Sequence, residues 1–264
     1  MQAARWIRMI GCGFGLLALL AVAPAVKAQP NMLFDDGGSH VFDGYCGYLT
    51  VRNNGDDPTS VEIVSSAGIT GDAYVYDTSQ LTVSGSTIDY VHVYDSSQLI
   101  VSGGHTSVRA YNDTQVTISG GTLQSVGTLN SSQLTISDGS IILAPEVMDS
   151  SQVTISGGSI VGGDLRAYDS SQVTISGGTI AATLKIHSNL TIDGSGFSKP
   201  LGTYTRPGED DPYYGSLSGI LADGTPFTNN FQIHGDGQLI LTPEPATLAL
   251  LAVGGVGLLL RRRV

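Results

Sequence analysis

Acidic and amide side chains recur in this 264-residue chain at a spacing that could serve calcium binding. They stand three residues before each glutamine of a repeated eleven-residue unit, at Asp77, Asp95, Asn112, Asn130, Asp149 and Asp169. A stacked column of these oxygens could ligate Ca²⁺, but carboxylates one strand apart repel each other. The Gly-Gly-x-Gly-x-Asp motif of nine-residue calcium repeats is also absent. We therefore expect Asx-turns, in which each side chain bonds backbone two residues on, with calcium ligation as the alternative. No metal or cofactor is predicted.

The histidines and serines offer no comparable pattern. The five histidines share no column of the repeat and lack the spacing of a metal site: His40, His92, His105, His187 and His234. Serines are so abundant that no single Ser-His-Asp set stands out. A β-helix polysaccharide lyase or hydrolase is the enzymatic alternative, but a lyase needs clustered basic residues or a calcium site. The basic residues from Arg52 to Arg206 are dispersed, and we expect no catalytic activity.

The repeated unit predicts the architecture that positions these residues. "YDSSQVTISGG" at Tyr168–Gly178 is a near-copy of "MDSSQVTISGG" at Met148–Gly158, and related units precede both. The anchor glutamines of the units are Gln80, Gln98, Gln115, Gln133, Gln152 and Gln172. Leu, Val or Ile stand one and three residues after each glutamine and alternate with polar neighbours, as in a half-buried strand. A period near 18 residues without helical periodicity therefore predicts an all-β fold, a parallel β-solenoid with coils of about 18 residues.

Two further columns are expected to shape the coils. Gly-Gly pairs should occupy corners that require positive φ: Gly103-Gly104, Gly120-Gly121, Gly157-Gly158 and Gly177-Gly178. An aromatic column occupies Tyr76, Tyr94, Tyr111 and Tyr168, and is interrupted by Leu129 and Met148. Because aliphatic residues can replace the ring, the position demands bulk. We expect the rings to stack inside or along the core, and sugar binding is the alternative.

The outward positions of the anchor strand form a candidate adsorption face. Since the aliphatic residues face inward, the intervening Gln, Thr and Ser must face outward. The threonines of this face are Thr82, Thr117, Thr135, Thr154 and Thr174. Thr suits a strand surface and side-chain ladders stabilise stacking, so a structural role is sufficient. A flat, periodic array of hydroxyls and amides could also adsorb to a polysaccharide or to ice.

The N-terminal end has the pattern of a targeting segment. Two arginines and an apolar run over 10–22 precede the small residues Val26 and Ala28. This order predicts a secretory signal peptide over 1–28, cleaved between Ala28 and Gln29. A first transmembrane helix is the alternative, but the run is shorter than the roughly 20 residues that span a bilayer.

The C-terminal segment "TPEPATLALLAVGGVGLLLRRRV" at 242–264 combines three features. A Pro-Glu-Pro sequence precedes an apolar stretch over 246–260, expected to form a single helix, and a basic tail follows. The residues of the motif and of the basic tail are Pro243, Glu244 and Pro245, and Arg261, Arg262 and Arg263. The segment resembles the PEP-CTERM sorting signal of bacterial secreted proteins. This resemblance implies that a membrane enzyme, an exosortase, recognises the tail and removes the helix near Pro-Glu-Pro. A plain membrane anchor is the alternative.

Composition limits the partners. The chain holds 12 Lys and Arg against 23 Asp and Glu, and half of the basic residues lie in its two ends. The part between the ends is therefore strongly acidic, which excludes nucleic acid as a partner. Cys46 is the one cysteine of that part, and we expect a buried thiol, with an intermolecular disulfide as the alternative.

The chain is expected to divide into five parts: the signal peptide at 1–28, an N-terminal cap with first rungs at 29–59, solenoid repeats at 60–196, a C-terminal β cap at 197–241, and the sorting signal at 242–264. We expect a secreted, non-catalytic protein of structural or adhesive type, at the cell surface or in the extracellular matrix. It passes through an inner-membrane intermediate, where its helix enters the membrane. Its expected partners are an exosortase-type enzyme and exopolysaccharide. The alternative is a glycan- or ice-adsorbing protein that uses the Gln-Thr-Ser face.

Overall fold

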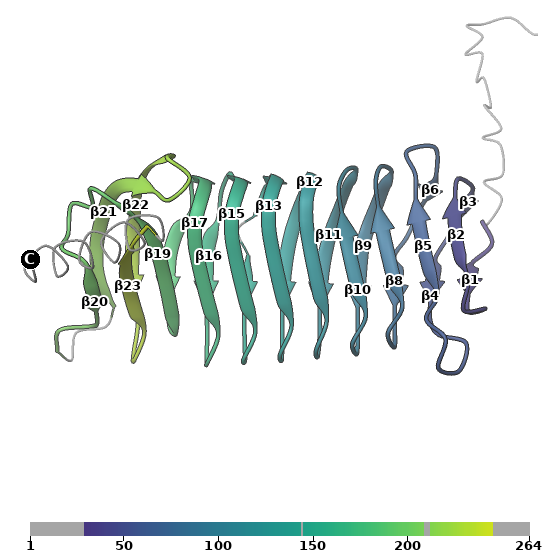
Figure 1. Cartoon of the computed structure of the whole chain (residues 1–264), viewed down its shortest axis with the longest axis horizontal. Coiled ribbons are helices and arrows are strands. Elements are labelled where there is room, and N and C mark those ends of the chain that lie inside the picture. Colours follow the sequence, from purple (N-terminus) through teal and green to yellow (C-terminus); the bar gives the residue numbers. More distant parts are fainter. Residues whose placement is uncertain (1–28, 144, 209–211, 245–264) are drawn as a thin grey trace, which may run out of the picture.

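The computed structural model describes residues 29–143, 145–208 and 212–244. Every regular element in these ranges is a β-strand, and one sheet of 21 strands winds through the molecule beside a sheet of two. The coils stack side by side into an elongated rod that runs from β1–β3 at one end to β20–β23 at the other (Figure 1). The predicted all-β parallel solenoid is confirmed, with coils of about 19 residues.

The strands fall into three groups in chain order. The first group contains β1 (Met32–Phe34), β2 (Ser39–Phe42), β3 (Tyr45–Cys46), β4 (Leu49–Val51), β5 (Ser60–Ile63) and β6 (Gly68–Ile69). The repeats contain β7 (Ala73–Val75), β8 (Gln80–Val83), β9 (Thr87–Val93), β10 (Gln98–Val101), β11 (His105–Ala110), β12 (Gln115–Thr128), β13 (Gln133–Ile141), β14 (Glu146–Val147), β15 (Gln152–Ile160), β16 (Asp164–Ala167), β17 (Gln172–Ile180), β18 (Thr183–Ile186) and β19 (Asn189–Ser195). The C-terminal part contains β20 (Gly202–Tyr204), β21 (Tyr213–Leu221), β22 (Pro226–Ile233) and β23 (Gln238–Pro243).

Each coil of the repeat has three straight segments. In the coil of β15 and β16, the first segment begins at Gln152, the second is the pair Ser159 and Ile160, and the third is Asp164–Ala167. Each segment pairs in parallel with the same segment of the coils before and after it. We call the outer side of the first segments the anchor face, and the outer side of the third segments the aromatic face. The aromatic face includes β4, β7, the ends of β9 and β11, the end of β12, and β14, β16, β18 and β22.

The core lies inside the coils and is built from the aliphatic columns. Residues one and three positions after each anchor glutamine are buried, as Leu134 and Ile136 illustrate. Leu165 and Ala167 are the buried residues of the third segment. Burying one such Leu or Ile stabilises the fold by roughly 1.5–3 kcal/mol. Cys46 is buried and free, as expected.

A column of hydroxyls directly before the anchor glutamine is also buried, which the sequence pattern did not reveal. Its members are Thr59, Ser79, Ser97, Thr114, Ser132, Ser151, Ser171 and Ser188. Ser97 and Ser151 donate their hydroxyl protons to the carbonyl oxygens of Tyr94 and Met148. These two hydroxyls thereby close their corners from inside, whereas the hydroxyls of Thr114 and Ser132 have no hydrogen-bond partner among the described residues.

The corner before each anchor strand is a four-residue turn. The backbone N–H of Ser97 donates to the carbonyl of Tyr94 at 3.2 Å, and Asp95 between them has a φ of 61°. Its side chain bonds a different group from the one that an Asx-turn would use. Asp95 Oδ2 accepts the backbone N–H of Asp77 in the preceding coil at 3.2 Å. The predicted Asx-turn bond is therefore corrected: positive φ makes the turn, and the side chain links neighbouring coils.

The other corner depends on the Gly-Gly pairs, as predicted. The second glycine of each pair has positive φ, for example 76° at Gly158. The first glycine is needed for close approach, because a Cβ at Gly157 would lie 2.1 Å from the carbonyl oxygen of Ser137 in the preceding coil. A side chain at Gly157 would therefore require the neighbouring backbone to shift, although the preceding coil has Asp138 at the same place in its repeat.

The residues after the repeat add a further coil and a hairpin. β22 pairs in parallel with β18, and β23 pairs in parallel with β19, so both continue sides of the solenoid. β21 and β22 form an antiparallel hairpin, and β20 pairs antiparallel to β23. The segment expected as a C-terminal cap thus contains strands that extend the stack, and β23 ends at Pro243.

Both terminal targeting segments lie outside the described residues. These are the predicted signal peptide at 1–28 with Ala28, and the tail from Pro245 through the expected helix at 246–260 to Arg261, Arg262 and Arg263. Within the described ranges, no helix is long and apolar enough to cross a membrane.

Candidate functional site

The anchor face carries the predicted threonines on its outer side. Thr117, Thr135, Thr154 and Thr174 pair in register across four successive coils. Thr82 lies two coils before Thr117, because Ile100 occupies this position in the coil between them. All five side chains are exposed or half-buried, and the buried residues beside them face the core. The threonines therefore form a straight column on one flat side of the rod.

Amide side chains run beside the threonine column. The anchor glutamines pair in register from Gln80 to Gln172, and Gln80 Nε2 donates to Gln98 Oε1 at 3.3 Å. From β10 to β17 the outward residues of the first segment are Gln, Ile, Thr and Ser, none of which is charged. This part of the anchor face can bind through hydroxyl and amide hydrogen bonds, with little electrostatic contribution.

The tyrosine column stacks as predicted, and it does so on the outer surface. The rings of Tyr76 and Tyr94 lie 5.1 Å apart between centroids with 7° between their planes, and those of Tyr94 and Tyr111 lie 4.9 Å apart at 6°. Each ring is half-buried, and the Tyr94 ring is stacked between the rings of the coils before and after it. The column thus forms a ladder along the corner of the aromatic face.

The prediction that the histidines share no column was wrong. His187 stacks on Tyr168 with ring centroids 4.7 Å apart, and His234 stacks on His187 at 4.1 Å. Both histidines follow buried isoleucines that pair in register, Ile186 and Ile233. The pattern was missed because β22 lacks the eleven-residue unit, so its alignment with the repeat appears only when the strands are paired.

A second column lies beside the tyrosines, two residues earlier in each coil. In register it contains Tyr74, His92, Arg109, Gly127, Glu146, Arg166 and Lys185. His92 stacks on Tyr74 with centroids 5.2 Å apart, and its Nε2 lies 3.9 Å from Asp72. Burial lowers the pKa of the His92 imidazole, against the opposing effect of Asp72. This column lies outside the eleven-residue unit, two residues before the residue at which the unit begins, so the repeat of the unit did not reveal it.

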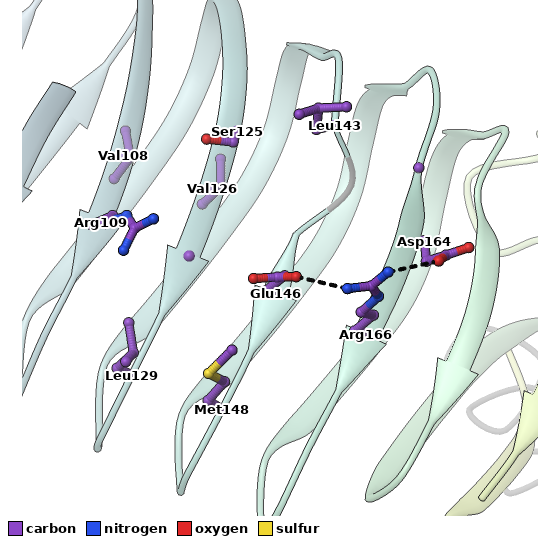
Figure 2. Close-up of a pocket in the computed structure, with 12 residues that line it drawn as sticks. Val108, Arg109, Ser125, Val126, Leu129, Leu143, Glu146, Met148, Asp164 and Arg166 are labelled. Carbon is purple, nitrogen blue, oxygen red and sulfur yellow. Dashed lines mark hydrogen bonds and ion pairs between the residues drawn. The ribbon is translucent and has the colours of Figure 1, made fainter. Parts of the chain in front are cut away.

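Ion pairs organise the centre of this column. The Arg166 guanidinium bonds Glu146 at 3.1 Å and Asp164 at 3.0 Å (Figure 2). Lys185 Nζ lies 2.8 Å from Asp164. Hydrogen bonds from Lys185 and Arg166 lower the pKa of the Asp164 carboxyl group, which therefore stays ionised at neutral pH. Two carboxylates and a guanidinium are thus held in fixed positions at the surface.

A hollow of roughly 350 Å³ opens beside these ion pairs, where the second column has Gly127 in place of a long side chain. Arg109 lies on one side of the gap and Glu146 on the other (Figure 2). Leu129 and Met148, the two residues that interrupt the tyrosine column, line the edge nearest the Asx corner. The hollow therefore combines an aliphatic ledge with charged hydrogen-bonding groups, the usual composition of a small-ligand site.

Within the described ranges, no group of three or more His, Cys, Asp or Glu side chains is placed to hold a metal ion. In the Asp and Asn column, the candidate for calcium, one side-chain oxygen of each of five members accepts a backbone N–H of the preceding coil: Asp77, Asp95, Asn130, Asp149 and Asp169.

The predicted sorting residues begin inside the fold. Pro243 is the last residue of β23, and Gly194 pairs with it in register. Glu244 accepts a hydrogen bond from the Ser195 hydroxyl at 3.0 Å, and Thr242 bonds Asp193. The described part of the segment continues the last strand to Pro243 and is half-buried on the last coil. Gln29, beside the predicted signal cleavage point, is the first described residue.

Comparison with protein-family models matches residues 241–263 to the PEP-CTERM protein-sorting motif. The resemblance of the tail is thereby confirmed, and its bounds shift by one residue. The motif implies recognition by an exosortase-type processing enzyme and export through the associated membrane sorting system. Comparisons with curated proteins and with solved structures gave no match. The solenoid must therefore be interpreted from its own surface.

Proposed function

We propose that this exported protein has no catalytic role and attaches to extracellular polysaccharide as a structural or adhesive component of the cell surface or matrix. The sorting motif supports export. The observation that carries the proposal is the in-register column of Thr117, Thr135, Thr154 and Thr174 on an uncharged side of the rod. The column presents one hydroxyl and one methyl group per coil, spaced by about 4.8 Å.

Such an array suits a repetitive, hydroxyl-rich target. Each hydroxyl can donate and accept a hydrogen bond, and each methyl group can pack against an apolar C–H face. One contact is weak, but contacts repeated along a rigid rod add to a useful affinity without further ordering cost. Because this part of the face is uncharged, attachment should change little with salt.

The pair of surface carboxylates supports binding over hydrolysis. A glycosidase needs one carboxyl group that stays protonated near neutral pH, so that it can act as the general acid. Asp164 has a lowered pKa and is committed to Lys185 and Arg166, so it cannot serve as that acid. Glu146 shares the same arginine. The arrangement holds acceptors for hydroxyl groups, and Asp164 supplies no proton.

The test measures depletion of the secreted protein by the extracellular polysaccharide of its host. A triple variant, Thr117→Val, Thr135→Val and Thr154→Val, keeps the shape of the anchor face and removes three hydroxyls. We expect roughly tenfold weaker adsorption. The matched control places the same change on the second segments, at Thr87, Thr122 and Thr179, and should bind like the wild type. Equal binding by both triples would refute the anchor-face account, and absence of wild-type binding would refute attachment itself.

Ice is the competing target for the same periodic face. Partition of the protein into a growing ice front, with the same two triples, distinguishes the two targets. Retention in ice together with no adsorption to polysaccharide would favour the ice-adsorbing alternative and overturn the proposal.

A further inference from the structure

Neither the backbone conformation nor the available space requires a glycine at Gly127. Its φ is not positive, and a Cβ built on it would meet no atom within 4 Å. Of the glycines whose surroundings the structure describes, it alone combines these two properties. The residues before and after it in the column are Arg109 and Glu146, so long side chains are accommodated on both sides. A glycine inside a strand destabilises the sheet, and often marks a place where a ligand approaches the backbone closely.

The absent side chain creates the hollow. Arg109 forms its first wall, and Glu146, fixed by Arg166, forms the opposite wall (Figure 2). Leu129 and Met148 supply an aliphatic ledge along one edge. The hollow is continuous with the tyrosine ladder, because Leu129 and Met148 belong to the same column as the rings on either side of them.

We propose that the hollow binds one neutral sugar ring of an extracellular polysaccharide; the choice of ligand class rests on the attachment function proposed above. A pyranose has an apolar C–H face and a rim of hydroxyls. Its C–H face would pack on Leu129 and Met148. Adjacent hydroxyls would accept from the Arg109 guanidinium and donate to the Glu146 carboxylate.

The charges of the hollow favour a neutral ring over an acidic one. Its lining has two cations, Arg109 and Arg166, and two anions, Glu146 and Asp164, so the formal charges cancel. An acidic sugar would bring its carboxylate close to the two anions. Arg109 is the available donor, because within the described part of the chain it makes a ring contact with Tyr90, at 6.0 Å from the centroid, and no ion pair.

The flanking rings extend the site to a chain of sugars. Tyr111 stands one coil before Leu129, and Tyr168 stands one coil after Met148, on the same corner. Each half-buried ring exposes apolar surface for a neighbouring sugar unit. The glycan would therefore lie along the rod axis, with its central ring in the hollow.

Calorimetric titration of the secreted protein with defined hexasaccharides tests the inference. The probes are hexasaccharides of β-1,4-glucose, β-1,3-glucose and β-1,4-mannose, and α-1,4-galacturonic acid as the acidic arm. Gly127→Gln fills the gap at a position where space and φ allow it, and we expect roughly tenfold weaker binding of the neutral probe. Arg109→Gln removes the guanidinium and should weaken binding by a similar factor.

Two controls separate the hollow from a general change of the surface. Gly127→Ala adds a single methyl group in open space and should keep most of the affinity. Thr50→Gln puts the same glutamine in the same column four coils away, since Thr50 pairs with Tyr74, and should bind like the wild type. Melting temperatures no lower than that of the wild type in all four variants show that the fold is intact.

The outcomes distinguish this inference from the attachment function. If the wild type adsorbs to polysaccharide but Gly127→Gln binds the hexasaccharide as tightly, the hollow is not the site, and attachment stands. Binding of the galacturonic acid probe alone overturns the choice of a neutral sugar. If the wild type binds neither polymer nor any hexasaccharide, the attachment function and the hollow fail together.

Discussion

Asp169 accepts a hydrogen bond from the backbone N–H of Asp149, one coil earlier in the stack, at 3.3 Å between N and Oδ2. Asp149 does the same for Asn130 at 2.8 Å. Both aspartates have a φ of 56°. One residue per coil therefore turns its own chain and ties down the previous turn. Asp, Asn and Gly tolerate positive φ, and only the first two carry an acceptor, which explains the composition of the column.

Substitutions at Asp149 should separate these two contributions. Asp149→Asn keeps both the φ tolerance and an acceptor, so its stability should be nearly unchanged. Asp149→Gly keeps the turn but loses the bond to Asn130, and Asp149→Val loses both. We expect Val to cost about 2 kcal/mol or more, because a β-branched residue is strained at positive φ. Urea unfolding measures the free energy of unfolding of the three variants and so gives the order of their stabilities. A valine variant as stable as the glycine variant would show that φ does not determine this corner.

Two glycines should respond oppositely to the same substitution. Gly127→Ala should be neutral or stabilise by up to about 1 kcal/mol, because it restricts the unfolded chain and meets no atom. Gly157→Ala should destabilise by roughly 3 kcal/mol or prevent folding, since its Cβ would lie 2.1 Å from the Ser137 carbonyl oxygen. Thermal unfolding of the two variants checks this. Equal effects would mean that the coils are not as closely stacked as described.

The Asp164 ion pairs predict a pH dependence. Hydrogen bonds from Lys185 and Arg166 lower the folded-state pKa of Asp164, so its stabilising contribution is present above the unfolded-state value of about 3.9. That contribution is lost as the pH falls through the folded-state pKa. The difference in unfolding free energy between wild type and Asp164→Asn should thus be constant near neutral pH and shrink below about pH 4. A difference that persists unchanged in acid would contradict the assignment.

His92 predicts a second pH effect, at higher pH. Burial lowers its folded-state pKa, so the folded protein disfavours the charged imidazole. Stability should be fully present above the unfolded-state value of about 6.5 and should decline as the pH falls through the folded-state value. His92→Gln should remove this decline. Chemical unfolding between pH 8 and 5 measures it, and a variant with the same decline as the wild type would place its origin elsewhere.

The period and the alternation of residue types were enough to predict the coils. Because Leu134 and Ile136 alternate with polar neighbours, the inward and outward sides of the anchor strand could be assigned, and Thr135 does face outward. The positive φ of Gly158 was predicted from the recurrence of Gly-Gly pairs at one corner of each coil. These features are local to one repeat, and the chain repeats them in nearly the same letters.

The features that were missed are relations between coils. The bond from Asp149 to Asp169 depends on how two corners stack, and the column of His187 and His234 crosses the insertion that contains β20 and β21. The hollow at Gly127 becomes visible only when residues outside the eleven-residue unit are placed in register. A one-dimensional repeat shows what each coil contains, and the pairing of strands shows which side chains become neighbours.

Attachment to polysaccharide after processing of the tail is the central claim, and mass spectrometry of the native protein tests it most directly. Extracellular polysaccharide is isolated from a host that has an exosortase, washed at high salt, and digested, and the C-terminal peptide of the retained protein is measured. The account predicts that most of the protein is retained in this fraction and that its chain ends near Pro243. Protein found in the membrane fraction with an intact end at Val264, and none in the polysaccharide, would contradict it.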